Sequence, residues 1–128
     1  MGVWGIGVDI AHIPRFTRIW ARHPTRFVQK ALHPDEIRHL ETLSSEQKPQ
    51  YLASRWWAIK EATIKAFGKR LLFPEMATVR RAEADPRLKL QISGAALASF
   101  QRTGISATHV SISHDGEYAM ASVVLESG

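Results

Sequence analysis

The chain contains no cysteine, and this absence excludes two kinds of stabilising site. A disulfide framework cannot form, and neither can a zinc site built on thiolates. Long apolar runs are also missing, since no segment approaches the roughly 18 consecutive residues that a membrane-spanning helix needs. The first residues lead directly into a strand-like segment, so we expect no signal peptide and an intracellular protein without a membrane anchor.

Acidic residues are in the minority, with 12 Asp and Glu against 17 Lys and Arg, which gives a net charge of +5. Such an excess indicates an anionic partner, namely phosphate, nucleic acid or an acidic protein, or else simply a basic solvated surface. No internal repeat, low-complexity tract or linker interrupts the 128 residues. We therefore expect one domain over residues 1–128 with a single core.

Hydrophobic periodicity predicts an α+β fold, with helices concentrated in the first half and strands in the second. The expected elements are a strand at 3–10, a helix from 14 to about 20, a helix from 34, a helix ending at 68, a strand near 77–81, a turn at 85–86, a strand at 88–92, a helix at 95–102, and a hairpin over 109–126 with its turn around 115–116.

The helix that ends at Gly68 has the most unusual pattern of the chain. Residues 57–68 are apolar on nearly every side of the helix, yet they include Lys60, Glu61 and Lys65. A helix of this kind should be buried, and buried Lys or Glu is rare unless it is paired or binds something. These charges are therefore the first candidates for chemistry, although Glu61 and Lys65, one turn apart, could also form a simple ion pair.

A second candidate, Asp9, ends the first expected strand. Gly5, Gly7 and Asp9 share one face of this strand, while large apolar residues occupy the other. The glycines predict that another backbone or a ligand comes close to the strand beside Asp9. A dinucleotide-binding loop is not favoured, because the third glycine of that fingerprint is missing. Alone, Asp9 would suit a helix cap; together with Glu61 and the nearby lysines it indicates a Mg²⁺ ion shared with a phosphate.

His114 follows Ser113 directly and precedes a tight turn, a common place for a functional side chain and also for a structural histidine. A hydrolase triad is not favoured, since no Gly-x-Ser-x-Gly elbow surrounds a serine. The six histidines contain no i,i+4 pair, which gives little support to a histidine-held metal. The residues alone thus predict a basic α+β domain with a Mg²⁺–phosphate site, and they leave the substrate open.

Three blocks of the sequence, residues 5–16, 55–68 and 110–124, resemble in order the motifs of the holo-acyl-carrier-protein synthase family, the small 4′-phosphopantetheinyl transferases. Residues 26–27 and 32–40 also follow the family pattern, so the resemblance covers nearly the whole chain. It implies the fold of that family, an antiparallel sheet packed with helices. It also implies a homotrimer with active sites between subunits. Two features suggest surfaces that assembly would bury. One is the bare face of the first strand at Gly5 and Gly7, and the other is the apolar closing strand with Met120, Val123 and Val124.

The resemblance further implies an enzyme that transfers phosphopantetheine from coenzyme A to a serine of an apo acyl carrier protein and releases 3′,5′-ADP. Carried over by motif, Asp9 and Glu61 would be Mg²⁺ ligands and, with Lys65, catalytic residues; Arg55, Lys60, Lys65, Gly68, Ser113 and His114 would contact the coenzyme; and Arg15 and Arg26 would bind the carrier protein. One position departs from the family, whose members often place an arginine four residues before the Lys-Glu pair. Trp56 occupies that position here and the arginine is Arg55, so a local one-residue shift would be needed to restore the contact.

Two other functions remain open from the sequence. The first is a Mg²⁺-dependent transferase that uses another pyrophosphate donor. The second is a basic nucleic-acid-binding module, which is disfavoured because the basic residues are scattered and most aromatic residues occupy core-like positions. We therefore expect no nucleic-acid partner. The tryptophan-rich central motif favours a mitochondrial matrix protein over the alternative, the bacterial cytoplasm.

Overall fold

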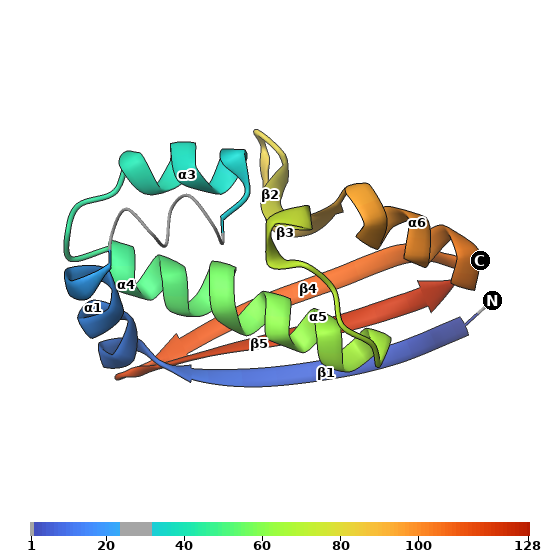
Figure 1. Ribbon diagram of the computed structural model, residues 1–128, viewed down its shortest axis with the longest axis horizontal. Helices are drawn as coiled ribbons and strands as arrows, with labels where there is room; N and C mark the ends of the chain where they lie inside the picture. Colours follow the sequence, from blue (N-terminus) through green and yellow to red (C-terminus); the bar gives the residue numbers. More distant parts are fainter. Residues whose placement is uncertain (1, 24–31) are drawn as a thin grey trace.

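A computed structural model describes residues 2–23 and 32–128, and its main feature is a long antiparallel sheet (Figure 1). The strands β1 (Gly2–His12), β5 (Tyr118–Ser127) and β4 (Ile105–Asp115) form this three-stranded sheet in the order β1-β5-β4. A separate two-stranded hairpin consists of β2 (Met76–Ala82) and β3 (Asp85–Ile92). The predicted α+β class and the antiparallel sheet are confirmed.

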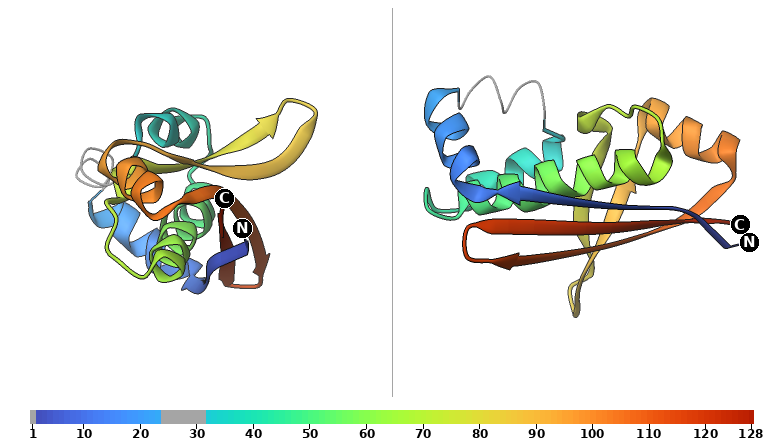
Figure 2. Two further views of the ribbon diagram at one scale, coloured as in Figure 1. Left: turned by 90° about the vertical axis from the view of Figure 1, so that its right-hand side faces the viewer. Right: turned by 90° about the horizontal axis from the view of Figure 1, so that it is seen from below.

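A continuous helical segment crosses one face of the three-stranded sheet. It consists of α4 (Lys48–Tyr51), a π-helical stretch η1 (Leu52–Ala58) and α5 (Ile59–Phe67). Gly68 ends the helix with a φ of 85°, a left-handed conformation that favours glycine, as the sequence predicted. Figure 2 shows α1, α4 and α5 on the same side of the sheet.

The remaining helices surround this segment. The first, α1 (Ile13–Arg22), follows β1 directly, and α3 (Pro34–Glu41) begins with a capping box between His33 and Glu36. A short 3₁₀ turn, η2 (Phe73–Glu75), precedes the hairpin, and α6 (Gly94–Thr103) precedes β4. Among residues 2–23 and 32–128, no helix is long and apolar enough to cross a bilayer.

The two faces of the sheet differ strongly in burial. The side chains of Ala11, Ala119, Ala121, Val123 and Leu125 face the helices and are buried. On the outer face, Ile6, Val8, Ile10 and Met120 are 70%, 55%, 63% and 43% exposed. Strand alternation places these four together because Ile10 pairs with Met120 in the β1–β5 ladder. An apolar sheet face is thus left uncovered by the described residues.

One predicted turn is wrong by two residues. The β2–β3 turn lies at Glu83–Ala84, and Asp85 and Pro86 already belong to β3. Pro86 is tolerated because both strands of a two-stranded hairpin are edge strands. An edge strand can lack one backbone N–H donor on its outer side without losing a hydrogen bond to its partner. The Asp85 carboxylate accepts hydrogen bonds from Arg87. One of them runs from the Arg87 backbone N–H to Asp85 Oδ1 at 3.1 Å.

Candidate active site

The site begins where β1 and α5 cross in close contact. A Cβ atom at Gly5 would lie 2.0 Å from the carbonyl oxygen of Ala66, and one at Gly7 would lie 1.9 Å from that of Ala62. Both positions therefore require glycine, and the expected close backbone approach is confirmed, with α5 as the approaching element. The glycine face is consequently buried within the chain, which corrects the prediction that assembly would be needed to cover it.

This crossing brings Asp9 to Lys65. The Lys65 ammonium donates to Asp9 Oδ1 at 2.9 Å and to the Val8 carbonyl at 3.1 Å. The Lys65 side chain remains 54% exposed, whereas that of Asp9 is only 13% exposed. Lys65 thus reaches from α5 across the edge of the sheet, and its nearest carboxylate is Asp9, not the Glu61 expected from helical spacing.

Glu61 lies one turn before Lys65 and beside the same strand. Gly5 faces Ala66 and Gly7 faces Ala62, so α5 runs antiparallel to β1. Asp9, the next residue on that face of β1, is therefore directed toward the helical turn that carries Glu61. Glu61 is partly exposed. The structure thus joins Asp9 to Lys65 and places Glu61 on the same helix, one turn before Lys65.

The residues present fit a Mg²⁺ ion. Asp9 Oδ2 is buried and has no hydrogen-bond partner among the described residues, which leaves it available as a ligand. No group of three or more His, Asp or Glu side chains that could hold a metal occurs in the described part of the chain. Two carboxylates match Mg²⁺, which commonly binds one or two of them and completes its shell with water and substrate phosphates.

Lys60 was predicted to contact the coenzyme, and this prediction is wrong. Its side chain is fully buried and donates to Glu36 Oε1 at 2.5 Å and to the Phe73 carbonyl at 2.9 Å. Burial lowers the pKa of Lys60 and raises that of Glu36, while the attraction between the two charges opposes both shifts. Lys60 therefore joins α5 to α3 inside the protein, and no surface is left for a ligand.

Arg55 lies in the π-helical stretch, on the side of the helix that faces β2. Its Nε donates to Thr78 Oγ1 and its Nη2 to the Thr78 carbonyl, both at 3.0 Å, and its guanidinium lies 5.1 Å from the centre of the Tyr51 ring. The backbone N–H of Ile59 bonds to the carbonyl of Ser54, five residues earlier. A π turn holds one residue more than an α turn, so Arg55 is brought toward the place that Trp56 would occupy in a regular helix. A displacement of this kind is what the resemblance would need for Arg55 to take the place of the usual arginine.

Arg55 and His114 line one surface hollow of about 240 Å³, together with side chains of α3, α4 and β4. In the ladder His114 pairs with Ala119 and Ser113 with Met120, so the two neighbours point to opposite faces of the sheet. His114 faces the helices and Arg55. Ser113 shares the outer face with Ile10, so the structure does not bring it to Arg55.

The candidate residues thus form two separate groups. Asp9, Glu61 and Lys65 lie where the helix meets β1, at one edge of the sheet. Arg55 and His114 lie where the helix meets β2 and β4, at the opposite edge. The helix stands between the groups within one chain.

Two further predicted residues, Gly68 and Arg15, lie outside both groups. Gly68 ends α5, and a Cβ atom added to it would meet no atom of the described residues within 4 Å. Arg15 is exposed on α1, with its guanidinium 4.6 Å from the centre of the Trp57 ring. Arg26 lies outside the described residues. Sequence reasoning missed Glu36 and Thr78, the partners of Lys60 and Arg55, because contacts over 24 and 23 positions leave no local pattern.

A search of family models finds the 4′-phosphopantetheinyl transferase superfamily over residues 5–123. The chain belongs to this superfamily. Among its members, the holo-[acyl-carrier-protein] synthase of Desulfovibrio desulfuricans is 39% identical over 127 residues, which cover 96% of this chain and 97% of the relative. That of Yersinia pestis is 34% identical over 131 residues, covering 99% and 100%.

Solved structures of the superfamily share the fold. The synthase from Neisseria meningitidis matches with a TM-score of 0.84 and 27% identity, over 97% of this chain and 98% of that one. The Bacillus anthracis synthase, solved in complex with CoA (3′,5′-ADP), matches with a TM-score of 0.78 and 25% identity over the full length of both chains. The relatives named here are bacterial, and they give no support to the mitochondrial prediction.

Proposed function

We propose that this chain transfers the 4′-phosphopantetheine group of coenzyme A to a serine hydroxyl of an apo acyl carrier protein, giving the holo carrier protein and 3′,5′-ADP. The observation that carries the proposal is the cluster of Asp9, Glu61 and Lys65 at the β1–α5 crossing, in a chain whose family performs this type of transfer. The bacterial cytoplasm is the compartment that fits the relatives.

Each residue of the cluster has a distinct task. Asp9 and Glu61 would hold Mg²⁺, which when bound neutralises charge on the pyrophosphate of the coenzyme. The Lys65 ammonium, exposed and mobile on a long side chain, turns from Asp9 to the phosphate oxygens and stabilises the negative charge that develops on the leaving group. Glu61 accepts the proton of the serine hydroxyl, directly or through a water.

The reaction exchanges one phosphorus–oxygen bond for another. The serine oxygen attacks the phosphorus that carries the pantetheine arm, and a new phosphoester bond forms. The bond from that phosphorus to the bridging oxygen of the pyrophosphate breaks, and 3′,5′-ADP leaves with the bonding electrons. Arg55 and His114, in a hollow lined by Tyr51, bind the nucleotide end of the coenzyme, where a cation and an aromatic ring suit phosphate and adenine.

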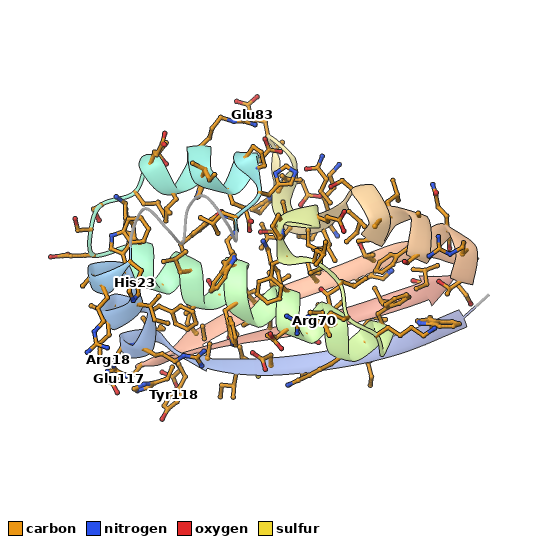
Figure 3. The ribbon with its side chains drawn as sticks, viewed as in Figure 1. Arg18, His23, Arg70, Glu83, Glu117 and Tyr118 are labelled. Atoms are coloured by element: carbon orange, nitrogen blue, oxygen red, sulfur yellow. The ribbon has the colours of Figure 1, made fainter. Side chains whose placement is uncertain are left out.

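The carrier protein binds at α1. Arg15, Arg18 and Arg22 are exposed and spaced three and four residues apart, so they form one basic face of this helix. Figure 3 labels Arg18 on α1, above Glu117 of the β4–β5 turn and Tyr118, the first residue of β5. An acidic carrier protein would be attracted to this face.

The working unit is a homotrimer in which neighbouring subunits share each active site. Two observations support this assembly. The outer face of the sheet, with Ile6, Val8, Ile10 and Met120, is apolar and exposed, and such patches usually mark interfaces. The Arg55–His114 hollow is also separated from Asp9 and Glu61 by the helix, and its 240 Å³ is below the volume of typical cofactor pockets, about 300–1,000 Å³. The Asp9–Glu61 edge of a neighbouring subunit would complete the coenzyme site at this hollow.

Intact-mass analysis of an apo acyl carrier protein, incubated with this protein, coenzyme A and Mg²⁺, tests the proposal. We expect the carrier protein to gain one phosphopantetheine, and an Asp9→Asn protein to produce no gain while melting at a similar temperature. Transfer only from a different pyrophosphate donor would favour the second enzymatic alternative. No transfer at all, combined with strongly salt-dependent nucleic-acid binding, would favour the non-enzymatic one.

A further inference from the structure

An aromatic cluster lies beneath the basic face of α1. Trp57 from the π-helical stretch packs against Phe16 of α1, with ring centres 6.1 Å apart, and against Phe73 and Trp56 at 5.8 and 5.6 Å. Trp56 is buried, whereas Trp57 remains partly exposed. The Arg15 guanidinium lies over two rings of this cluster, 4.6 Å from the Trp57 ring centre and 5.3 Å from that of Phe16.

The contact between Arg15 and Trp57 leaves the polar groups of Arg15 available. Among the described residues Arg15 forms no ion pair with a carboxylate. Its guanidinium lies over two aromatic rings, which carry no net charge. Stacking on an aromatic face uses the flat side of the guanidinium, and the N–H donors around its edge stay free for an acidic group. The arrangement holds an exposed cation in place without neutralising it.

We propose that Trp57 is a positioning residue for carrier-protein binding, because its indole holds Arg15 in the orientation that an acidic partner binds. This inference rests on the proposed function, in which Arg15 contacts the carrier protein. A free arginine side chain has about 2 kcal/mol of rotamer entropy. Holding it before the partner arrives reduces the ordering cost of binding. The π-helical turn that brings Arg55 to its hollow therefore also carries the residue that orients Arg15 on the other side of the helix.

The test compares apparent KM values for the carrier protein and for coenzyme A in a double-mutant cycle. Trp57→Leu should raise the KM for the carrier protein about two- to fivefold, the range of an exposed cation–π contact. The KM for coenzyme A and kcat should not change. In an Arg15→Ala background, Trp57→Leu should have no further effect on the carrier KM, because the side chain that Trp57 orients is gone.

Trp20→Leu is the matched control. Trp20 also lies under a cation, with the Lys48 ammonium 5.3 Å from its ring centre, and is also partly buried. Its replacement should leave the carrier KM unchanged. If Trp57→Leu does not fold, Trp57→Phe, which keeps an aromatic face, completes the cycle: it should give a smaller increase that again disappears with Arg15→Ala.

Two outcomes separate this inference from the proposed function. If Arg15→Ala raises the carrier KM but the Trp57 variants do not, or if their effects add independently, the positioning role of Trp57 is overturned while the function stands. If Arg15→Ala leaves the carrier KM unchanged, the assignment of Arg15 itself fails, and the role of Trp57 fails with it.

Discussion

The ion pair between Lys60 and Glu36 shows how differently two neighbouring charges of one helix are used. Lys60 is buried with its partner, while Glu61, the next residue, is partly exposed. Two buried charges lose their hydration, and their attraction offsets that loss only while both are present. Glu36 also accepts from the backbone N–H of His33 at 2.9 Å, which fixes the start of α3. The pair is therefore structural.

Lys60→Met should reduce the free energy of unfolding by about 3–5 kcal/mol, because it leaves the Glu36 carboxylate buried without a counter-ion. Chemical denaturation measures this directly. The double variant Lys60→Met/Glu36→Gln keeps the acceptor for His33 and removes both charges, so it should recover most of the stability. A single variant as stable as the parent protein would contradict the burial of this pair.

Lys65 is the opposite case, since an exposed cation can leave Asp9 for a phosphate. Lys65→Ala should weaken coenzyme A binding and lower kcat by about 10²-fold or more, the usual scale for losing a charge-stabilising group at a reacting centre. Lys65→Arg should recover only part, because the two cations differ in shape and hydration. Calorimetric titration with coenzyme A and single-turnover kinetics separate the two effects. Normal values for both would leave Lys65 as a structural partner of Asp9 alone.

At the scale of elements, the β1–α5 crossing determines whether the side chains of the candidate site meet. Asp9 is on the strand, while Glu61 and Lys65 are on the helix, and the absence of a Cβ atom at Gly5 and Gly7 lets the two elements come this close. Any displacement of the helix separates the charges that the proposed chemistry brings together.

Gly7→Ala should therefore reduce both stability and activity. Its Cβ would overlap the Ala62 carbonyl, which must move, at a cost of roughly 1–3 kcal/mol for an overpacked contact. Gly104→Ala is the control, because Gly104 has a φ of 79° with open space around it, at the end of α6. We expect the control to lose about 1–2 kcal/mol from left-handed strain while its specific activity stays normal. Thermal melting and initial rates measure the two quantities, and equal activity in both variants would contradict the role of the crossing.

The sequence was sufficient to predict most elements and to single out Asp9, Glu61 and Lys65 as candidates. The alternation around Gly5 and Gly7 and the charged apolar helix are local patterns, and both led to the site. Lys60 could not be distinguished from Lys65 in this way, because its burial depends on Glu36 and Phe73, which are distant in the chain. The π turn was also missed, although the displaced position of Arg55 was its one visible sign. The outer face of β1 was not recognised as exposed, since a strand pattern does not tell which of its faces a helix will cover.

At the scale of the whole molecule, the exposed apolar face and the divided site have one common explanation. A cyclic assembly would cover Ile6, Val8 and Ile10 of each subunit, and would bring the Arg55–His114 hollow of one subunit against the Asp9–Glu61 edge of the next.

Mixing two inactive proteins tests this arrangement. Glu61→Ala and His114→Ala subunits, unfolded together and refolded, should recover part of the parent activity, because some interfaces then combine two intact halves. Each variant refolded alone serves as the control. Light scattering should show trimers in all samples. A fully active monomer would contradict the assembly, whereas intact trimers without recovered activity would contradict only the shared site.

The position of β5 in the sheet has a consequence for how the protein is made. β5 is the central strand and pairs with both β1 and β4, yet it is the last of the described strands along the chain. During synthesis, β1 leaves the ribosome before the other described strands and has no partner strand until nearly all other described residues have followed. For that period its apolar residues stay exposed on an unpaired strand, the state most prone to aggregation. The sheet therefore forms after translation of β5, and a nascent chain that stops short of β5 would depend on chaperones.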